Sequence, residues 1–536
     1  MKNMRKLLAM ALAVLMVMSL ATTAFAADAD LSGHTYKAYQ IFAGTQSTDD
    51  DSTELGNITW GSGIDGAGFL AALQADETIG SVFTDCTTAI DVAEAITGWA
   101  DDNDNARAFA KIAYSYITGE GVSCVNGETT LDAGYYLVVD VTENVSGSAY
   151  NLALLQLTKK GDFEIANKTD VPEFIKKVDD KNDSNTSEDE TVWEDSADYD
   201  IGDQVPFKLE ATLADNVATY SNYKVIFHDN MTAGLTFNAE SVKVYVDGNL
   251  ISTGYEVKTE NTCSESCTFE VVIANVKAVG AGNSSVITVL YTAELNKNAV
   301  LGAPGNPNYA QLEYSNNPNW TGNGQPGETP DEPTGKTPED KVIVFTYKVI
   351  VNKVRQDGVD AEDKPVYAPL PGAVFTLQKW VKDGENDAEG KPVGHWVDLK
   401  TVETKPDTTF TFEGLDDGWY RLTEEKAPDG YNSIDPIHFD VTAEHDVKAD
   451  DPQLIKLEGS QTTKDGPNTT SGDLGTFEIV HNKLAGSLTT DILNLAGVEL
   501  PETGGMGTTL IYTAGAVMVV LAVVLLITKK RMAVEK

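Results

Sequence analysis

The stretch YKVIVNKV, Tyr347–Val354, decides what kind of fold this chain can adopt. Side chains alternate between the two faces of a β-strand, so Tyr347, Val349 and Val351 share one face. Lys353 falls on that same apolar face. The stretch therefore predicts a strand that faces a core and carries a lysine into it.

The same alternation recurs on both sides of this stretch, with turn residues between the runs. Examples are residues 205–209, 242–246 and 269–273. Short alternating strands separated by turns are typical of antiparallel β-sandwiches of the immunoglobulin type. We therefore expect a mainly β chain built from tandem immunoglobulin-like domains.

Composition divides the chain into segments. We expect an N-terminal domain over 27–168, a middle domain over 171–320 and a C-terminal domain over 342–484. A linker rich in Gly, Pro and acids, 321–341, separates the last two, and 485–499 forms a short stalk. The first domain has helix-like stretches between its strands, so we expect a β domain with a helical insertion.

The charge balance of the chain excludes one large class of partner. It has 39 basic and 82 acidic side chains, a net charge of −43. Such a field repels phosphate backbones, so no nucleic-acid partner is expected. The six histidines are scattered, and the sequence has no HExxH, G-x-S-x-G or phosphate-binding glycine loop. We expect no conventional enzyme, no metal site and no cofactor.

Five more polar side chains share a face with apolar neighbours, as Lys353 does: Glu424 and Asn482 in the C-terminal segment, and Lys176, Asp229 and Asn308 in the middle one. Buried charges are rarely left unpaired. In a first interpretation, the lysines reach solvent or form ordinary buried ion pairs. In a second, they react.

The reactive interpretation follows from burial. An apolar site lowers the pKa of a lysine and raises the pKa of a carboxyl, so both groups can be neutral. A neutral amine is a nucleophile, and a neutral acid can donate a hydrogen bond to an asparagine carboxamide. The product would be a Lys–Asn isopeptide bond that the chain forms on itself with loss of ammonia.

Several motifs resemble those of sortase-assembled backbone pilins of Gram-positive bacteria, the Spa type. PEFIKKV (172–178) and NYAQLEYSNNP (308–318) are similar to the middle domain of that family, and PLPGAVFTLQK (369–379) to its C-terminal domain. LTEEKAPDGY, Leu422–Tyr431, matches the family's E-box, LxExxAPxGY. The resemblance covers nearly the whole chain and implies immunoglobulin-like domains of the CnaA and CnaB types.

The resemblance also implies a lysine, a promoting acid and an asparagine in each of two domains: Lys176, Asp229 and Asn308, then Lys353, Glu424 and Asn482. The first domain would hold a third set, because GYYLVVD (134–140) parallels GWYRLTE (418–424). Lys37, Asp140 and Asn167 would be its members.

Both ends of the chain carry processing signals. Residues 1–26 combine a basic start, an apolar core and small residues at a cleavage site, which predicts a secretory signal peptide. Near the other end, an apolar run, 510–527, precedes Lys529, Lys530 and Arg531. This run predicts a transmembrane helix with a cytoplasmic basic tail.

The pentapeptide LPETG stands just before this run, as Leu500, Pro501, Glu502, Thr503 and Gly504. Pentapeptide, apolar span and basic tail together resemble the LPxTG cell-wall sorting signal. By that resemblance a sortase cysteine attacks the Thr503 carbonyl, Gly504 leaves, and an amine resolves the acyl-enzyme. The partners implied are a class C (pilin) sortase, a housekeeping sortase, other copies of the chain, minor pilins and peptidoglycan, with host or glycan receptors as further candidates.

In this family the amine comes from a lysine at the end of the first domain, usually within YPK. Here the matching region reads FEIANKTDVPEF, 163–174, and the YP is missing. Lys168 holds the corresponding place and is our candidate. Lys159, Lys160 and Lys177 are alternatives.

Four cysteines in an exported chain predict disulfides. Cys263 and Cys267 are close in sequence and are expected to pair, which leaves Cys86 and Cys124 as the second couple. Three pairings are possible on paper.

Together these features predict the structural backbone subunit of a covalently polymerised pilus with a role in adhesion. The subunit would be exported and anchored to the cell wall of a Gram-positive bacterium. The alternative is a monomeric wall-anchored adhesin or a minor pilin, which would share both ends and the β domains.

Overall fold

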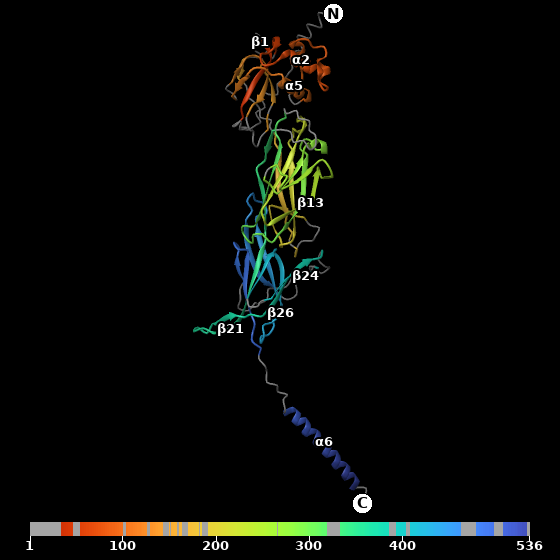
Figure 1. Cartoon of the computed structure of the whole chain (residues 1–536), viewed down its shortest axis with the longest axis vertical. Coiled ribbons are helices and arrows are strands. Elements are labelled where there is room, and N and C mark those ends of the chain that lie inside the picture. The colour runs from red at the N-terminus through yellow and green to blue at the C-terminus, as the bar shows by residue number, and fades with distance from the viewer. Residues whose placement is uncertain are drawn as a thin grey trace.

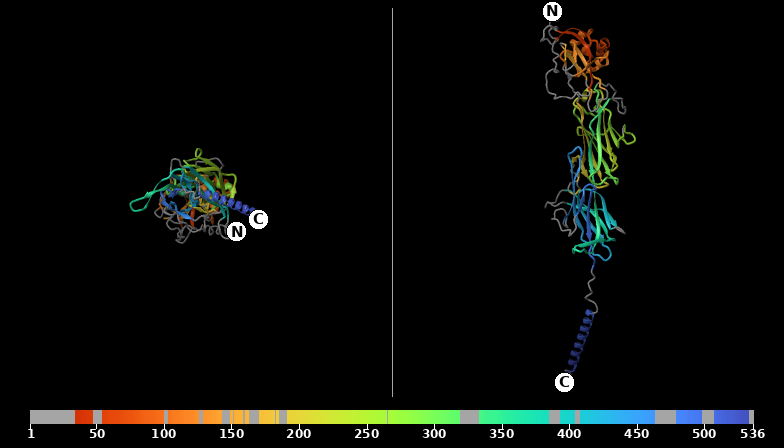
Figure 2. Two further views of the ribbon diagram at one scale, coloured as in Figure 1. Left: turned by 90° about the horizontal axis from the view of Figure 1, so that it is seen from below. Right: turned by 90° about the vertical axis from the view of Figure 1, so that its left-hand side faces the viewer.

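The computed structural model describes the chain over residues 34–46, 54–99, 103–125, 129–142, 149–150, 152–157, 160–162, 170–181, 183–184, 191–264, 266–318, 333–384, 393–403, 408–462, 479–497 and 507–532. Three domains follow one another along a rod, as Figures 1 and 2 show. This tandem, mainly β architecture confirms the predicted fold class.

The first domain is a sheet covered by helices on one face. The sheet has the order β2-β1-β5-β6, and β3 also pairs with β1. Its strands are β1 (Tyr36–Gln46), β2 (Leu55–Trp60), β3 (Val122–Cys124), β5 (Gly134–Asp140) and β6 (Leu152–Leu157), beside a small pair of β4 (Thr130–Leu131) and β7 (Gly161–Asp162). The helices are α2 (Gly66–Ala75), α3 (Gly80–Phe83), α4 (Ala89–Ala95) and α5 (Asp104–Ser115). Apolar helix residues such as Phe109 pack on Ile41 and Val139 of the sheet, so the helical insertion shares its core.

The middle domain is a sandwich of two sheets, ordered β10-β20-β18-β12-β16-β15 (with β19 on β18) and β14-β13-β17-β11-β8-β9. The first sheet contains β10 (Ser196–Asp198), β12 (Val225–Met231), β15 (Glu256–Thr259), β16 (Phe269–Ile273), β18 (Asn306–Ser315), β19 (Thr334–Lys336) and β20 (Asp340–Phe345). The second contains β8 (Glu173–Asp179), β9 (Trp193–Glu194), β11 (Gln204–Thr212), β13 (Leu235–Val246), β14 (Asn249–Ile251) and β17 (Val286–Leu295), and two 3₁₀ turns are η1 (Val217–Thr219) and η2 (Val276–Val279). Alternate residues of both sheets, such as Phe207 and Phe227, fill the core between them.

The C-terminal domain is a second sandwich, with sheets ordered β22-β21-β30-β29 (with β25 on β21) and β24-β23-β26-β27-β28. The first sheet contains β21 (Tyr347–Val359), β22 (Pro365–Pro369), β25 (Thr409–Leu415), β29 (Val480–Asn482) and β30 (Ser487–Leu493). The second contains β23 (Val374–Lys382), β24 (Gly394–Glu403), β26 (Gly418–Lys426), β27 (Ile437–His445) and β28 (Leu454–Thr462). The first strand, β21, pairs in parallel with the last, β30, and Lys353 lies opposite Ile492.

Two strands lie where the sequence predicted a linker or the start of the last domain. β19 and β20 both pair with β18, so they extend a sheet of the middle domain. β20 then leads directly into β21. The remainder of the predicted linker, 321–332, lies outside the described residues.

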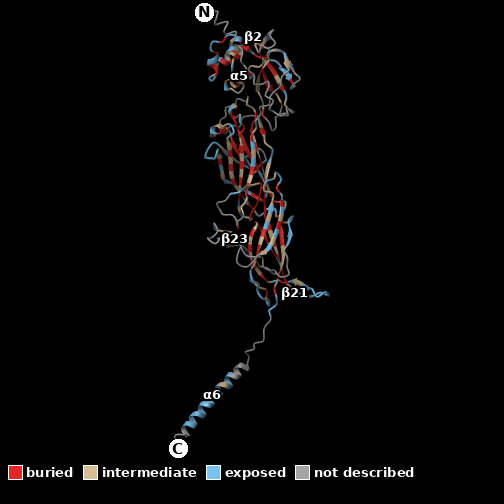
Figure 3. Cartoon of the chain, turned by 180° about the vertical axis from the view of Figure 1, so that it is seen from behind, coloured by how far each residue is buried: buried red, intermediate tan, exposed pale blue. Residues whose placement is uncertain are grey.

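Helix α6 (Gly507–Met532) follows the last domain, and its described side chains are largely exposed (Figure 3). Within the described part of the chain, no helix combines the length and apolarity that a membrane crossing requires. The predicted signal peptide, 1–26, lies outside the described residues.

Candidate crosslinking sites

Lys176, Asp229 and Asn308 meet in the core of the middle domain, as predicted. Lys176 projects from β8 in one sheet, while Asp229 and Asn308 lie on neighbouring strands, β12 and β18, of the other. All three are completely buried. The alternation of the three strands therefore turns a lysine, an acid and an amide into the same interior.

A tyrosine completes this site. Tyr291 of β17 donates a hydrogen bond from its hydroxyl to Asp229 Oδ2 at 2.6 Å and accepts one from Asn308 Nδ2 at 3.0 Å. Lys176 Nζ donates to Asp229 Oδ2 at 2.5 Å and to the Tyr291 hydroxyl at 2.8 Å. The hydroxyl thus contacts the amine, the acid and the amide at once. No motif in the sequence singled out Tyr291, and only its place on an apolar strand face was readable.

Burial sets the protonation of this site. It lowers the pKa of Lys176 and raises the pKa of Asp229, although the attraction between the two groups opposes both shifts. Burial also raises the pKa of Tyr291 well above its usual value, so the tyrosine keeps its proton. Among the described residues, Asp229 Oδ1 and Asn308 Oδ1 have no hydrogen-bond partner. The buried Asp229 carboxyl and the buried Asn308 amide thus each have one oxygen that accepts no hydrogen bond from the described residues.

A similar site lies in the C-terminal domain, but with a different asparagine from the one predicted. Lys353 Nζ is 3.8 Å from Glu424 Oε1 and donates a hydrogen bond to Asn494 Oδ1. Asn494 Nδ2 donates to both carboxylate oxygens of Glu424, each at 3.0 Å. Lys353 and Asn494 are at most 1% exposed and Glu424 is 7% exposed.

The prediction of Asn482 is therefore wrong for this contact. Asn482 lies in the short edge strand β29, its side chain is exposed, and its Oδ1 accepts a hydrogen bond from the backbone of Ala485. Asn494 follows β30, which runs beside β21, and its backbone N–H donates to Val354 O. The sequence pattern that could have identified Asn494 lies in the segment assigned to a stalk. There Leu488, Ile492 and Asn494 are separated by even numbers of residues, so they share one face of a strand.

The two lysines differ from a third buried lysine of the same chain. Burial lowers the pKa of Lys353 to about 8. Lys379 is just as buried, but three carboxylates surround its Nζ: Asp200 at 2.7 Å, Asp416 at 2.9 Å and Asp183 at 3.2 Å. These charges raise the pKa of Lys379 well above its usual value, so it is held as a cation. Unlike Lys379, the two crosslinking candidates each combine burial with one close carboxylate and an asparagine in the same cluster.

The set expected in the first domain does not assemble. Lys37 lies opposite Val139 and Tyr36 opposite Asp140, so Lys37 and Asp140 point to opposite faces of the sheet. Asp140 instead contacts His34 Nδ1 at 2.6 Å and the Thr142 hydroxyl at 2.6 Å. Asn167 lies outside the described residues.

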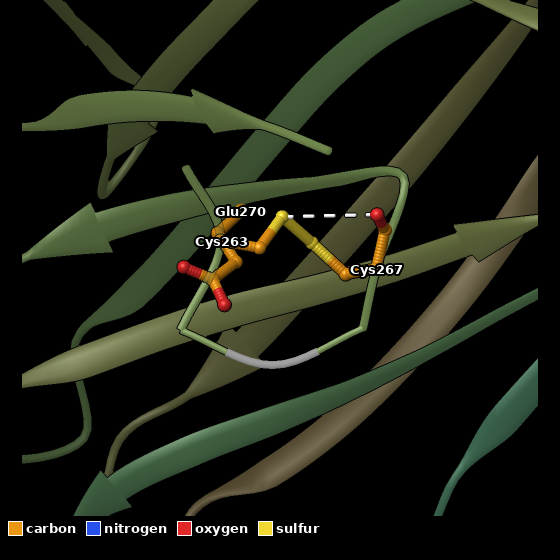
Figure 4. A group of neighbouring side chains, drawn as sticks. All are labelled: Cys263, Cys267 and Glu270. Carbon is orange, nitrogen blue, oxygen red and sulfur yellow. Dashed lines mark hydrogen bonds between the residues drawn. A yellow bond between two sulfur atoms is a disulfide. The ribbon is translucent and has the colours of Figure 1, made fainter. Parts of the chain in front are cut away.

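The cysteines form one disulfide in the structure. Cys263 and Cys267 are joined beside Glu270, as Figure 4 shows. Cys86 and Cys124 are free and buried in two different hydrophobic clusters, one under the helices and one on the other face of the sheet. The predicted Cys86–Cys124 pair is therefore wrong, because the sheet separates the two thiols.

The sites predicted for subunit joining are only partly described. The pentapeptide Leu500–Gly504, Lys168 and Lys159 lie outside the described residues. Of the alternative lysines, Lys160 forms an exposed ion pair with Asp132 at 2.9 Å. Lys177 is partly buried and pairs with Asp195.

Two protein families match this chain. Residues 201–318 match the family "Gram-positive pilin backbone subunit 2, Cna-B-like domain". Residues 353–453 match the SpaA family, "Prealbumin-like fold domain". The first match lies within the middle sandwich and the second within the C-terminal one, and each contains the acid of one site.

The chain is also similar to individual proteins. It is 28% identical over 413 residues to the trypsin-resistant surface T6 protein of Streptococcus pyogenes serotype M6, covering 68% of this chain and 70% of that protein. The structure of the T6 backbone pilin of the same serotype is 20% identical, with a TM-score of 0.46 and coverage of 87% of this chain and 97% of the other. The full-length major pilin SpaD of Corynebacterium diphtheriae is 16% identical, with a TM-score of 0.42 and coverage of 87% and 93%.

Proposed function

We propose how this chain, which belongs to the Gram-positive backbone pilins, is crosslinked internally and joined to its neighbours. It is a structural subunit of a surface pilus and not an enzyme. Internally, Lys176 bonds to Asn308 and Lys353 bonds to Asn494. Externally, a sortase joins the Thr503 carbonyl to a lysine of the next copy, for which Lys168 is our candidate. The observation that carries the internal part is the pair of buried lysine–acid–asparagine clusters.

Each internal bond forms by amide exchange. The neutral lysine Nζ attacks the asparagine side-chain carbonyl carbon, and the Nζ–C bond forms as the C–Nδ2 bond breaks. One amine proton stays on the new amide, and the other leaves with the Nδ2 group as ammonia. Asp229, whose pKa burial raises, polarises the Asn308 carbonyl and passes the proton, and Glu424 holds the corresponding place beside Asn494. At the middle site the unpartnered Asn308 Oδ1 is the acceptor that a protonated Asp229 requires.

The position of the bonds suits a fibre under tension. Lys176 lies in the first strand of its sandwich and Asn308 in a late one, and Lys353 and Asn494 bracket nearly all of the other sandwich. A pull on the chain then passes through each crosslink and bypasses the strands between. Neither carboxylate is exposed, so the reaction proceeds away from competing water.

Intact mass measurement of a recombinant 28–499 fragment tests the internal bonds. We expect a mass two ammonia molecules below the sequence mass. Asp229→Ala and Glu424→Ala should each restore one ammonia, and their double variant should restore both. An unmodified wild-type mass, in a fragment whose folding is confirmed by circular dichroism, would refute both bonds.

Polymerisation is tested on cell-wall extracts boiled in detergent and reductant. We expect a high-mass ladder from wild type, a single monomer band from Lys168→Ala, and an unchanged ladder from the matched control Lys160→Ala. A ladder from Lys168→Ala would move the joint to another lysine. A single band from wild type would favour a monomeric adhesin.

A further inference from the structure

One hairpin of the C-terminal domain projects away from the rod. Beyond Val354, β21 pairs only with β22 among the described residues, and every residue of the tip, 356–366, is exposed (Figures 1 and 3). Two valines of the tip, Val359 and Val366, are 55% and 42% exposed. An isolated two-stranded hairpin is marginally stable in water, and its open edges are templates for pairing. The open edges of this hairpin can therefore accept a partner.

The hairpin starts where the chain leaves the domain. Asn494 N donates to Val354 O at the hairpin base, and Gly497 is the last described residue before the sorting motif. Thr503 follows six residues later, so it can reach about 21 Å at ~3.5 Å per residue. The strand from Arg355 to Val359 extends about 13 Å at ~3.3 Å per residue. Whatever is bonded to Thr503 therefore lies within reach of the hairpin.

The charges of the tip indicate what kind of surface on a neighbouring copy it would bind. Between 355 and 364 the hairpin has four acids and two bases: Asp357, Asp360, Glu362 and Asp363 against Arg355 and Lys364. In a chain of net charge −43, an acidic element needs a local cluster of cations on its neighbour.

Such a cluster lies at the joint of the first two domains. Lys111 of α5 and Lys277 of η2 are half-buried, and both donate to backbone carbonyls at the end of η1. Arg107 is one helical turn from Lys111 and pairs with Asp104 at 2.7 Å. Asp170 lies near this cluster, because its Oδ2 accepts a hydrogen bond from Asp215 N, just before η1. Asp170 is two residues from the proposed joining lysine, Lys168.

We propose that the hairpin 355–369 of one subunit docks on the Arg107–Lys111–Lys277 cluster of the neighbouring copy, beside the covalent joint. This rests on the proposed polymerisation through Thr503 and Lys168. The joint supplies a high effective concentration, of the order of mM for a short flexible tether, so a contact too weak to form dimers suffices. The docking stiffens a junction that one flexible bond would leave free to bend.

Cysteine pairing in assembled fibres tests the contact. Cells expressing Glu362→Cys and Arg107→Cys in the same chain are oxidised, and peptides are analysed by mass spectrometry. We expect a 362–107 disulfide between copies in the polymer, at least fivefold above that in unpolymerised subunits. Leu250→Cys with Arg107→Cys is the matched control, because Leu250 is 61% exposed at the tip of another hairpin.

Hydrogen exchange of wild type provides a second measurement without substitutions. Amides of the tip, 356–366, should exchange at least tenfold more slowly in polymer than in monomer. A ladder with no tip protection and no 362–107 disulfide, or with equal crosslinking from Leu250, would overturn the docking while leaving polymerisation intact. Absence of any ladder would overturn polymerisation and the docking together.

Discussion

Replacing Asn494 should remove one crosslink and a large part of the stability of the last domain. The proposed bond closes a loop with a sequence separation of 141 residues. The chain-entropy relation for a crosslink of that length gives about 5 kcal/mol. Whole domains are stable by only about 5–15 kcal/mol, so this loss is a large fraction. For a domain of this size it corresponds to a melting temperature lower by roughly 15 °C.

The assay pairs calorimetry with intact mass on Asn494→Ala, with Asn482→Ala as the matched control. Asn494→Ala should restore one ammonia to the mass and lower the melting temperature. Asn482→Ala should keep both ammonia losses, and its exposed side chain should leave stability within about 0.5 kcal/mol. If Asn482→Ala restores the ammonia and Asn494→Ala does not, the geometric reasoning from Lys353 is refuted.

Three further predictions follow from the buried groups. Tyr291→Phe removes the hydroxyl that contacts the amine, acid and amide of the middle site. The Lys176–Asn308 bond, followed by the loss of ammonia in the intact mass, should then form at least tenfold more slowly. An unchanged rate would deny Tyr291 a role. Lys379→Met leaves three carboxylates without their cation and should destabilise the chain by about 3–5 kcal/mol, while both ammonia losses remain in the intact mass. The control Lys400→Met, at the surface, should leave the melting temperature nearly unchanged. The reactive form of Lys353 is the neutral amine, and the pKa of this lysine is about 8. The rate of bond formation after refolding should therefore rise about tenfold per pH unit below pH 8 and level off above it. A rate that falls with pH would contradict amine attack.

Strand parity was enough to find most of the candidate site. Lys176, Asp229, Asn308, Lys353 and Glu424 all lie on the apolar faces that their neighbours in sequence indicated. Parity is a local property of the extended backbone, so a few adjacent residues reveal it. The E-box and the mainly β fold were readable for the same reason, since both depend on short contiguous patterns.

Strand parity did not reveal which of these buried side chains contact one another. Asn482 and Asn494 both sit near the end of the domain, and only the parallel pairing of β30 with β21 places Asn494 beside Lys353. Tyr291 comes from a strand 115 residues away from Lys176, and no local pattern connects them. The Cys86–Cys124 prediction failed likewise, because the faces of the sheet in the first domain were unknown.

The sequence by itself determined which side chains would be buried in β-sandwiches and which chemistry their burial would favour. The tertiary structure alone decided which of them meet. Strand order, sheet pairing and the joint between domains are set by packing between distant segments. Two buried lysines thereby receive one acid and one asparagine each, while Lys379 receives three acids and remains a cation.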